Sequence, residues 1–412
     1  MTSYKAINKC RIADSSHLVS VLNLGHQSLT GVFPRSPEEP VTVGPLELVW
    51  CPDSGLLQLK HSYEASEMYG DNYGYRSGLN QSMVSHLGDK IAYLERLVQP
   101  KAGDVVVDIG SNDCTTLKSY KTAGLRRIGI DPTGRKFKEY YPADIAMVPD
   151  FFSADAYRSV EQKPARMVTS IAMFYDLDSP ITFAQQIESI LADDGVWHFE
   201  QSYMPSMLRL NSYDTICHEH LEYYSLGAVK RILDAAGLRL VDVVMNAVNG
   251  GSFAVTAARV GNQTVKTNHA VIDWLLAQEG RMGLNTPKPY RDFEERVFRH
   301  REDLTRLIKA LNDDGKKVLG YGASTKGNVV LQFCGLTSKE IPAIAEVNTE
   351  KFGRVTPGSH IPIISEAEAK AMNPDYFLVL PWHFKEGILR REKEYLASGG
   401  RFIFPFPEIE II

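Results

Sequence analysis

Polar residues and a glycine follow the short apolar run Val105–Ile109, and their types suit the binding of a ligand that contains a nucleoside. The run is rich in β-branched residues, which predicts a fully buried strand. Gly110 would allow a backbone turn to come close to a ligand where a side chain would block it. About 20 residues later a second predicted strand, Arg127–Asp131, ends in an acid, the place where a doubly wound sheet hydrogen-bonds a ribose diol. The residues expected to contact such a ligand are Asp108, Gly110, Ser111, Asp113 and Asp131.

This turn resembles that of the class I S-adenosylmethionine (SAM) methyltransferases. The G-x-G-x-x-G fingerprint of a dinucleotide-binding turn is absent here. Asp108 and Asp113 would repel a pyrophosphate, whereas they suit a sulfonium amino acid. The resemblance therefore implies SAM as the cofactor, and the alternative is an ordinary buried strand followed by a polar turn.

Two histidines flank a glutamate within the segment Tyr213–Tyr224. The spacing is not H-E-x-x-H, so a zinc protease site is not indicated. In an extended segment His218 and His220 would share one face and Glu219 would lie on the other. A histidine can act as a base near neutral pH, and a carboxylate can orient it. The alternative is a loop of satisfied polar residues.

A second glycine-containing turn, Gly320–Gly327, follows an apolar run and opens a predicted helix. A glycine turn at a helix N-terminus, with Ser324, Thr325 and Lys326, suits a phosphate. The sequence is neither a Walker A motif nor a full Rossmann fingerprint, so a plain strand-to-helix turn fits as well. A nucleotide-diphosphate sugar would fit the turn.

Cys10 and Cys51 lie in a segment of short predicted strands that suggests a zinc ribbon. Such a site needs four thiolate or imidazole ligands, and only two cysteines are present. His17, His26 or His61 could contribute. The favoured interpretation is a module without metal, with zinc as the alternative.

The elements that must position these residues alternate between strands and helices from residue 104 to about 260. This rhythm predicts a doubly wound parallel α/β sheet, whose strand ends at Asp108, Asp131, Ser170 and Gln201 should face the cofactor crevice. A helix is expected over Ser82–Leu97. Residues 268–313 should be helical, with a break at 287–289. The predicted strands lie near 105–109, 127–131, 145–148, 167–171, 196–200, 240–245 and 252–258.

Three parts of the chain are expected to fold as domains. Residues 1–65 form a small zinc-ribbon-like module with strands at Leu18–Leu22 and Leu46–Trp50. Residues 66–305 form the cofactor domain. Residues 306–412 form a smaller Rossmann-like unit with strands near 343–347, 376–380 and 401–404.

The composition excludes several functional classes. The 412 residues are too many for one ordinary core, and 44% hydrophobic with 23% charged residues is typical of a globular protein. A net charge of −5 makes a nucleic-acid partner improbable. No apolar run suggests an export signal or a membrane span, so a cytoplasmic protein is expected. Five scattered cysteines argue against a disulfide framework.

The motifs taken in order resemble those of the nucleotide-sugar C-methyltransferases, in particular the TDP-sugar C-3 methyltransferases, over nearly the whole chain. These proteins have a zinc-binding N-terminal module, a central SAM domain and a C-terminal Rossmann-like domain that helps to bind the sugar nucleotide. The motifs here are Tyr73–Gly78, Val107–Asp113, His218–His220 with Tyr224–Ser225, Gly320–Lys326 and Gly353–Gly358.

The resemblance implies roles for individual residues. His220 would be the general base with Glu219 beside it, Tyr75 would lie against the reacting sugar, and Tyr75 or His218 would stabilise an enolate oxygen. The residues implied in substrate binding are Tyr224, Gly322, Ser324, Lys326 and Arg354.

This sequence departs from the family pattern at three places. The Cys-x-x-Cys pairs of the family are Cys10…Ala13 and Cys51…Ser54 here, which puts zinc in doubt. Cys217 stands where the family usually has tyrosine. Tyr175 lies near the place where the family often has histidine after the fourth strand.

The implied reaction is the methylation of C-3 next to the ketone of a nucleotide-linked 4-keto-deoxy sugar. A base would remove the C–H proton and the enolate would take the methyl group. Two alternatives stay open, namely O-methylation of a sugar hydroxyl and a protein that binds SAM or the sugar nucleotide without catalysis. A nicotinamide enzyme is disfavoured, because Glu346 is the only acid that could serve its second strand. The expected partner is the nucleotide-diphosphate sugar, and the chain is expected to be a monomer or a weak dimer.

Overall fold

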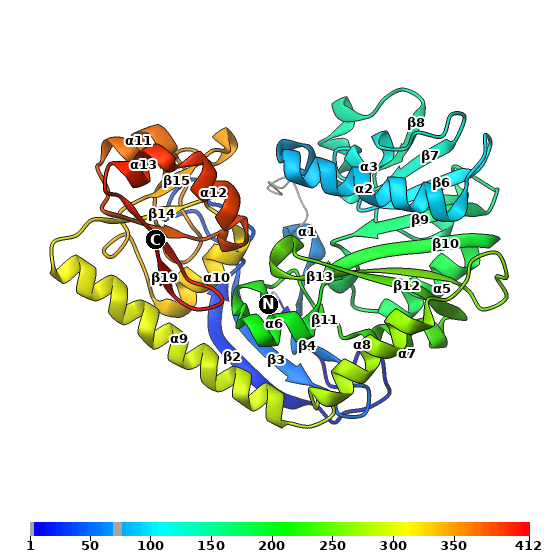
Figure 1. Ribbon diagram of the computed structural model, residues 1–412, viewed down its shortest axis with the longest axis horizontal. Helices are drawn as coiled ribbons and strands as arrows, with labels where there is room; N and C mark the ends of the chain where they lie inside the picture. Colours follow the sequence, from blue (N-terminus) through cyan, green and yellow to red (C-terminus); the bar gives the residue numbers. More distant parts are fainter. Residues whose placement is uncertain (1–3, 69–75) are drawn as a thin grey trace.

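The computed structural model describes residues 4–68 and 76–412. Figure 1 shows two α/β lobes side by side, with N-terminal strands and the long helix α9 (Lys288–Asp313) running beneath and joining them. The lobe at the right contains the central sheet, and the lobe at the left contains the C-terminal sheet.

The central sheet has seven strands in the order β12-β13-β10-β9-β6-β7-β8. The five strands from β8 to β10 follow the 3-2-1-4-5 order of a doubly wound sheet and are parallel. All seven predicted strands are present, but β13 is antiparallel to both neighbours, because a short loop connects it to β12. The bounds are β6 (Val105–Ile109), β7 (Arg126–Ile130), β8 (Ile145–Val148), β9 (Ala165–Ile171), β10 (Leu191–Ser202), β12 (Leu238–Asn246) and β13 (Ser252–Arg259).

Helices cover both faces of the central sheet. On one face Ile91 and Leu94 of α2 (Gln81–Val98) pack with Val106 of β6. On the other face α5 (Pro180–Ile190) and α7 (Leu226–Ala235) pack with Val105 and Val107. The two faces of β6 are both apolar, which explains the unbroken β-branched run in the sequence. Other helices of this lobe are α3 (Thr115–Lys118), α4 (Ala154–Arg158), α6 (Met204–Leu210) and α8 (His269–Arg281).

The N-terminal sheet is completed by a strand from the middle of the chain. β2 (Val19–Ser28), β3 (Val43–Trp50) and β4 (Leu57–Leu59) pair in order, and β11 (Glu222–Tyr223) pairs with β4. A separate two-stranded ribbon pairs β1 (Tyr4–Ala6) with β5 (His61–Tyr63), and the short helix α1 (Ala65–Met68) follows. The N-terminal segment therefore shares its sheet with the residues that follow the His-Glu-His motif.

The C-terminal sheet has the order β16-β15-β14-β17-β18-β19, in which only β19 is antiparallel. The first five strands again follow the 3-2-1-4-5 order of a Rossmann-like sheet. Its strands are β14 (Val318–Tyr321), β15 (Ile344–Glu346), β16 (Ile363–Ser365), β17 (Tyr376–Val379), β18 (Arg401–Phe404) and β19 (Glu410–Ile411), and its helices are α10 (Thr325–Cys334), α11 (Glu366–Ala371), α12 (Lys385–Arg391) and α13 (Lys393–Ala397).

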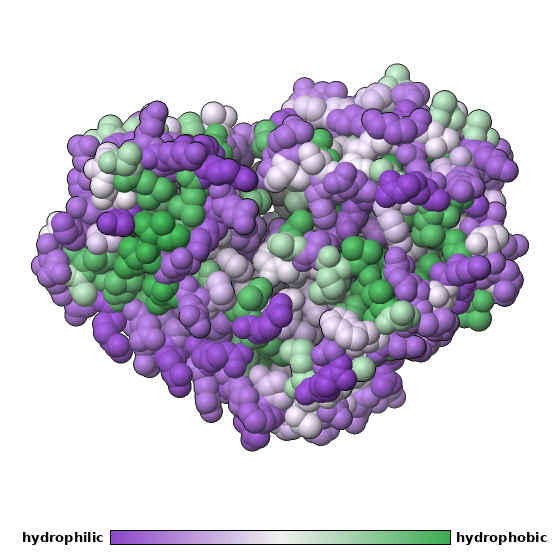
Figure 2. Space-filling model, in the orientation of Figure 1, coloured by the Kyte–Doolittle hydropathy of each residue, from purple (hydrophilic) through white to green (hydrophobic). Residues whose placement is uncertain are grey.

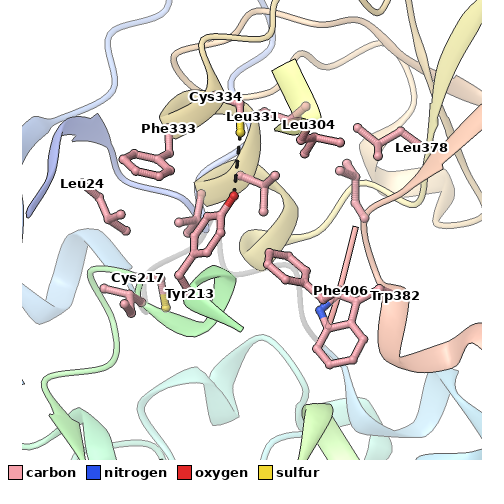
Figure 3. Packing of buried hydrophobic residues seen from close by; sticks show 14 of the residues in the cluster. Leu24, Tyr213, Cys217, Leu304, Leu331, Phe333, Cys334, Leu378, Trp382 and Phe406 are labelled. Atoms are coloured by element: carbon pink, nitrogen blue, oxygen red, sulfur yellow. Dashed lines mark hydrogen bonds between the residues drawn. The ribbon is translucent and has the colours of Figure 1, made fainter. Parts of the chain in front are cut away.

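One apolar core joins the N-terminal sheet to the C-terminal sheet. It runs from β3 through the segment after α6 and through α9 to β17. Figure 3 shows Tyr213, which precedes the His-Glu-His motif, inserted beside Phe333 and Phe406 of the C-terminal lobe. Its hydroxyl contacts His300 Nδ1 at 3.1 Å and Cys334 Sγ at 3.8 Å. The motif is thus anchored from both sides.

No helix of the described chain has the length and apolar character that crossing a membrane requires.

Candidate active site

The first predicted turn lies at the carboxyl edge of β6, next to the end of β9, where a doubly wound sheet reverses its strand order. Gly110 has a φ of +71°, a left-handed conformation that favours glycine. A Cβ atom at Gly110 would lie 3.2 Å from the Cγ of Met173, which follows β9. Glycine is therefore required both by the turn and by the close approach of the two loops.

Two predicted acids are buried at the carboxyl ends of β6 and β7. Asp108 accepts a hydrogen bond from Thr169 Oγ1 at 2.6 Å, and burial raises the pKa of Asp108 to about 7. Asp131 accepts from the Thr133 backbone N–H at 2.6 Å and from the Asn112 N–H at 2.7 Å. Asp131 thus ties the turn after β6 to the turn after β7, a structural role that the sequence did not indicate.

The polar residues of the turn also have partners within the protein. Ser111 Oγ lies 2.7 Å from the hydroxyl of Tyr141. Asp113 accepts from Thr115 Oγ1 at 2.6 Å and from the Gly78 N–H at 3.0 Å. The turn is therefore tied down by hydrogen bonds and carries the Asp113 carboxylate at the carboxyl edge of β6.

Two further residues that were predicted to contact the cofactor, Ser170 and Gln201, are buried. Ser170 Oγ accepts a hydrogen bond from Trp197 Nε1 at 2.9 Å in the core, so its side chain does not point into the crevice. That prediction is wrong for the side chain, because successive residues of β9 point to opposite faces. Gln201 is 1% exposed, and its amide has no hydrogen-bond partner within the described chain.

His220 has the geometry of a base. Its Nδ1 lies 2.9 Å from the carbonyl oxygen of Thr215, and a carbonyl can only accept, so Nδ1 carries the proton. The lone pair is therefore on Nε2. The imidazole packs against the ring of Tyr175 with centroids 4.2 Å apart. Burial and the nearby charge of Lys326 lower the pKa of His220 to about 3, which keeps the ring neutral.

His218 does not join His220. The segment turns at residues 218–219 instead of remaining extended, so the predicted shared face is wrong. His218 is fully buried in the N-terminal part, with its ring edge-to-face against Tyr63 at 4.7 Å. Burial lowers its pKa to about 4. The expected role of His218 as a donor to an enolate oxygen is therefore corrected to a packing role.

Glu219 lies where all three parts of the chain meet. Its Oε2 is 3.4 Å from Thr30 Oγ1 of the N-terminal part. A Cβ atom added to Gly31 would overlap Glu219 Oε1 and would lie 3.7 Å from Thr325 Oγ1, the first residue of α10. Burial raises the pKa of Glu219, which favours its protonated form.

Lys326 extends from the C-terminal lobe toward the same place. Its Nζ donates to the carbonyl oxygen of Asn249 at 2.8 Å. Burial lowers its pKa, and the charge of Asp214 opposes that shift. Asp214 is itself buried and accepts from Trp382 Nε1 at 2.7 Å. A cation thus stands beside the base, in a junction held by buried polar bonds.

The other predicted substrate contacts are mainly structural. Tyr224 is fully buried and stacks on Phe174 at 5.3 Å, so it belongs to the core and the prediction is wrong. Arg354 donates to the carbonyl oxygen of Phe33 at 2.9 Å and fastens the N-terminal loop. Ser324 caps α10 by accepting from the Gly327 N–H.

Two predicted residues remain, Gly322 in substrate binding and Tyr75 in catalysis. Gly322 has a φ of +80°, and a side chain there would collide with Pro381 at 2.6 Å. The turn after β14 is thus closed by the loop after β17. Tyr75 lies outside the described residues, together with the first part of the Tyr73–Gly78 motif.

The two cysteines of the expected zinc ribbon do lie together. Cys10 Sγ is 3.2 Å from Ser54 Oγ, and Cys51 is buried against both residues. The described residues hold no group of three or more metal-ligating side chains. Two thiols and a hydroxyl do not make a structural zinc site, which needs four thiolate or imidazole ligands. The donor set therefore does not fit zinc.

Several residues of the site were not predicted. Tyr141 and Thr30 approach from loops distant in sequence, and nothing in their neighbours identifies them, whereas Asp214 lies within the segment Tyr213–Tyr224 but was not singled out. Gly129 did carry a signal, because a Cβ atom there would lie 2.6 Å from Ser111 Oγ, and glycine within a β-branched strand indicates a close approach.

The strand order and the turn after β6 define a class I SAM-dependent methyltransferase. Comparison with known proteins narrows this class. Residues 83–243 match the family model "Methyltransferase domain", residues 247–407 match "C-methyltransferase C-terminal domain", and residues 10–69 match "Putative zinc binding domain". C-methyltransferase NovU of Streptomyces niveus is 32% identical over 412 residues, which cover 99% of this chain and 97% of that protein. The chain belongs to the C-methyltransferase family and is a SAM-dependent carbon methyltransferase.

Two solved methyltransferases resemble less than half of this chain. Magnesium protoporphyrin IX methyltransferase from Synechocystis PCC 6803, solved with bound SAM, is 12% identical with a TM-score of 0.32, over 43% of this chain and 79% of that chain. The CcbJ methyltransferase from Streptomyces caelestis is 11% identical with a TM-score of 0.33, over 42% and 89%.

Proposed function

We propose that the protein methylates C-3, the carbon next to the ketone, of a nucleotide-linked 4-keto-deoxy sugar. The observation that carries the proposal is the fixed tautomer of His220, whose Nε2 lone pair is available at a junction of all three parts of the chain. Met173 packs on the cofactor turn at Gly110, and Tyr175, two residues later, packs on His220. The base and the cofactor turn are therefore linked through one short loop.

The residues of the junction suit each step of this reaction. His220 Nε2 takes the proton from the carbon next to the ketone. Glu219, whose pKa is raised by burial, and Lys326 are the groups placed to stabilise the developing enolate oxygen. When bound, SAM supplies the electrophilic methyl group. Figure 2 shows the surface hollowed between the two lobes, a place where a substrate would be enclosed by both.

A feature of the C-terminal lobe supports a sugar nucleotide as the substrate. Lys326 lies at the N-terminus of α10, where backbone N–H groups and the helix dipole favour an anion. A substrate whose sugar lies at His220 would place its diphosphate toward this end of the helix. The proposal keeps the expected division of labour, with cofactor binding in residues 66–305 and sugar-nucleotide binding in residues 306–412.

Mass spectrometry of the protein with SAM and TDP- or GDP-4-keto-6-deoxy sugars tests the reaction. A mass gain of one methylene on the keto sugar, with none on its reduced counterpart, is the expected result. A gain on the reduced sugar would instead show O-methylation of a hydroxyl. No gain on any keto sugar, in a protein that binds SAM, would refute the substrate class.

The role of His220 has a separate test. In D₂O without SAM, the wild-type protein should exchange the proton next to the ketone, and His220→Asn should slow that exchange about 10²- to 10⁴-fold. Because the pKa of His220 is about 3, the wild-type rate should show no loss from protonation of this histidine between pH 5 and 8. An inflection near pH 6.5 that His220→Asn removes would contradict the structure.

A further inference from the structure

Arg76 lies on the cofactor turn and has no assigned role. The residues Arg76–Leu79 form a strap that crosses the turn after β6. The backbone N–H of Ser77 donates to Asn112 Oδ1 at 3.0 Å, and that of Gly78 donates to Asp113 Oδ2 at 3.0 Å. The strap therefore follows the turn along two consecutive residues.

The side chain of Arg76 completes this contact with a charge. Its Nε lies 3.7 Å from Asp113 Oδ2, and its guanidinium stacks 4.5 Å from the ring centroid of Tyr140. Only 25% of the side chain is exposed. Guanidinium has five N–H donors, and Nε of Arg76 is buried without a hydrogen-bond partner within the described chain. Stacking on Tyr140 and the charge of Asp113 hold the group at the turn.

The amino-acid part of SAM carries an ammonium group and a carboxylate. The acids of the turn suit the ammonium group, but they would repel the carboxylate unless a cation stands among them. A guanidinium binds a carboxylate with two parallel hydrogen bonds, which is why arginine is favoured for this task. Arg76 is the cation that contacts Asp113 at the mouth of the turn.

We propose that Arg76 binds the α-carboxylate of SAM, with Asp113 as its fixed counter-ion. The inference rests on SAM dependence of the protein and not on the identity of the methyl acceptor. It assigns to the strap a direct contact with the cofactor.

A second network keeps the strap in register. The helix α2 follows the strap, and its residues His86 and Lys90 both pair with Glu200 at the end of β10, His86 Nε2 at 2.5 Å. Asn246 Nδ2 donates to the same carboxylate at 2.6 Å. These bonds fix the first half of α2 against the sheet, and the strap with Arg76 leads directly into that helix.

Calorimetric titration with SAM and with decarboxylated SAM tests the proposal, because the two ligands differ only by the carboxylate. Arg76→Gln should weaken SAM binding about 10- to 100-fold, the range of a lost charge-assisted hydrogen bond. It should leave the affinity for decarboxylated SAM within about twofold. Arg76→Lys keeps the charge but not the fork, and should retain part of the preference for SAM.

Three results separate the alternatives. Equal weakening of both ligands in Arg76→Gln would mean that Arg76 acts only by positioning Asp113, and would overturn the proposal. Unchanged affinity for SAM, in a variant with a wild-type melting temperature, would also overturn it. Arg96→Gln, which removes an exposed charge from the far end of α2, is the matched control and should leave both affinities unchanged. Failure of the wild-type protein to bind SAM would refute the cofactor assignment together with the proposal.

Discussion

Substitution of Gly31 by alanine should inactivate the enzyme without unfolding it. The backbone of Gly31 does not have a positive φ, so alanine is compatible with its conformation. A methyl group there would overlap Oε1 of Glu219, while Cδ of the same side chain would lie 3.4 Å from the added carbon. Glu219 ends in a flexible carboxyl group, which can move away by about 1 Å to restore ordinary contact.

The expected magnitudes differ for stability and for activity. Because a flexible side chain absorbs the strain, the free energy of unfolding should fall by less than about 1 kcal/mol. A displacement of about 1 Å in a catalytic group can lower turnover about 10²-fold. We therefore expect kcat to fall about 10²-fold, whereas the Kd for SAM stays within about twofold, since the cofactor turn is not contacted.

Urea unfolding, SAM titration and methyl-transfer rates on one preparation measure these three quantities. Gly261→Ala is the matched control, because a Cβ atom at Gly261 meets nothing within 4 Å. Full activity of folded Gly31→Ala would refute the placement of Glu219 in the active site. An equal loss of activity in Gly261→Ala would show that the effect is not local.

Three further predictions concern the framework of the site. Metal analysis of the purified protein should find no stoichiometric zinc, and a chelator should leave its melting temperature unchanged. The double variant Ala13→Cys, Ser54→Cys should instead bind about one zinc per chain. Trp382→Phe removes the indole N–H that donates to the buried carboxylate of Asp214, and should lower the free energy of unfolding in urea by about 1–3 kcal/mol. An unchanged free energy of unfolding would refute this hydrogen bond. Glu200→Gln should destabilise by about 3 kcal/mol at pH 7, because it removes the buried carboxylate that two half-buried basic side chains pair with. Burial alone would raise the pKa of Glu200, but those partners hold it below the usual 4.5. The free energy of unfolding of the wild-type protein should therefore decline as the pH falls below about 4.5. Acid unfolding curves of the variant should lack that decline.

The regular elements could be predicted because their signals are local. The β-branched run at Val105–Ile109 and the alternation of strands and helices locate the central sheet without knowledge of any partner. The grouping of polar residues at the strand ends could be predicted from the same pattern, because parallel strands end on one edge of the sheet. Asp108, Gly110 and Asp131 are therefore found together, as the sequence predicted.

The orientation of side chains in irregular segments could not be predicted. The turn at His218–Glu219 leads into β11, which pairs with β4, a contact between residues far apart in sequence. The same holds for Ser170 and Tyr224, whose polar groups are used within the core. Tertiary contacts decided these positions, and no local propensity reports them.

The pairing of β11 with β4 also has a consequence for synthesis of the protein on the ribosome. The N-terminal sheet cannot be completed until residue 223 has left the exit tunnel, and the hydrogen bond that the Ser28 N–H donates to Gln332 Oε1 waits for a segment 304 residues downstream. Until then the edge of β4 and the apolar side chains of β3 stay uncovered, a state in which nascent chains aggregate. We expect the N-terminal sheet to be completed last, although most of its strands are synthesised first. We also expect slow translation past residue 223 to increase the demand for chaperones.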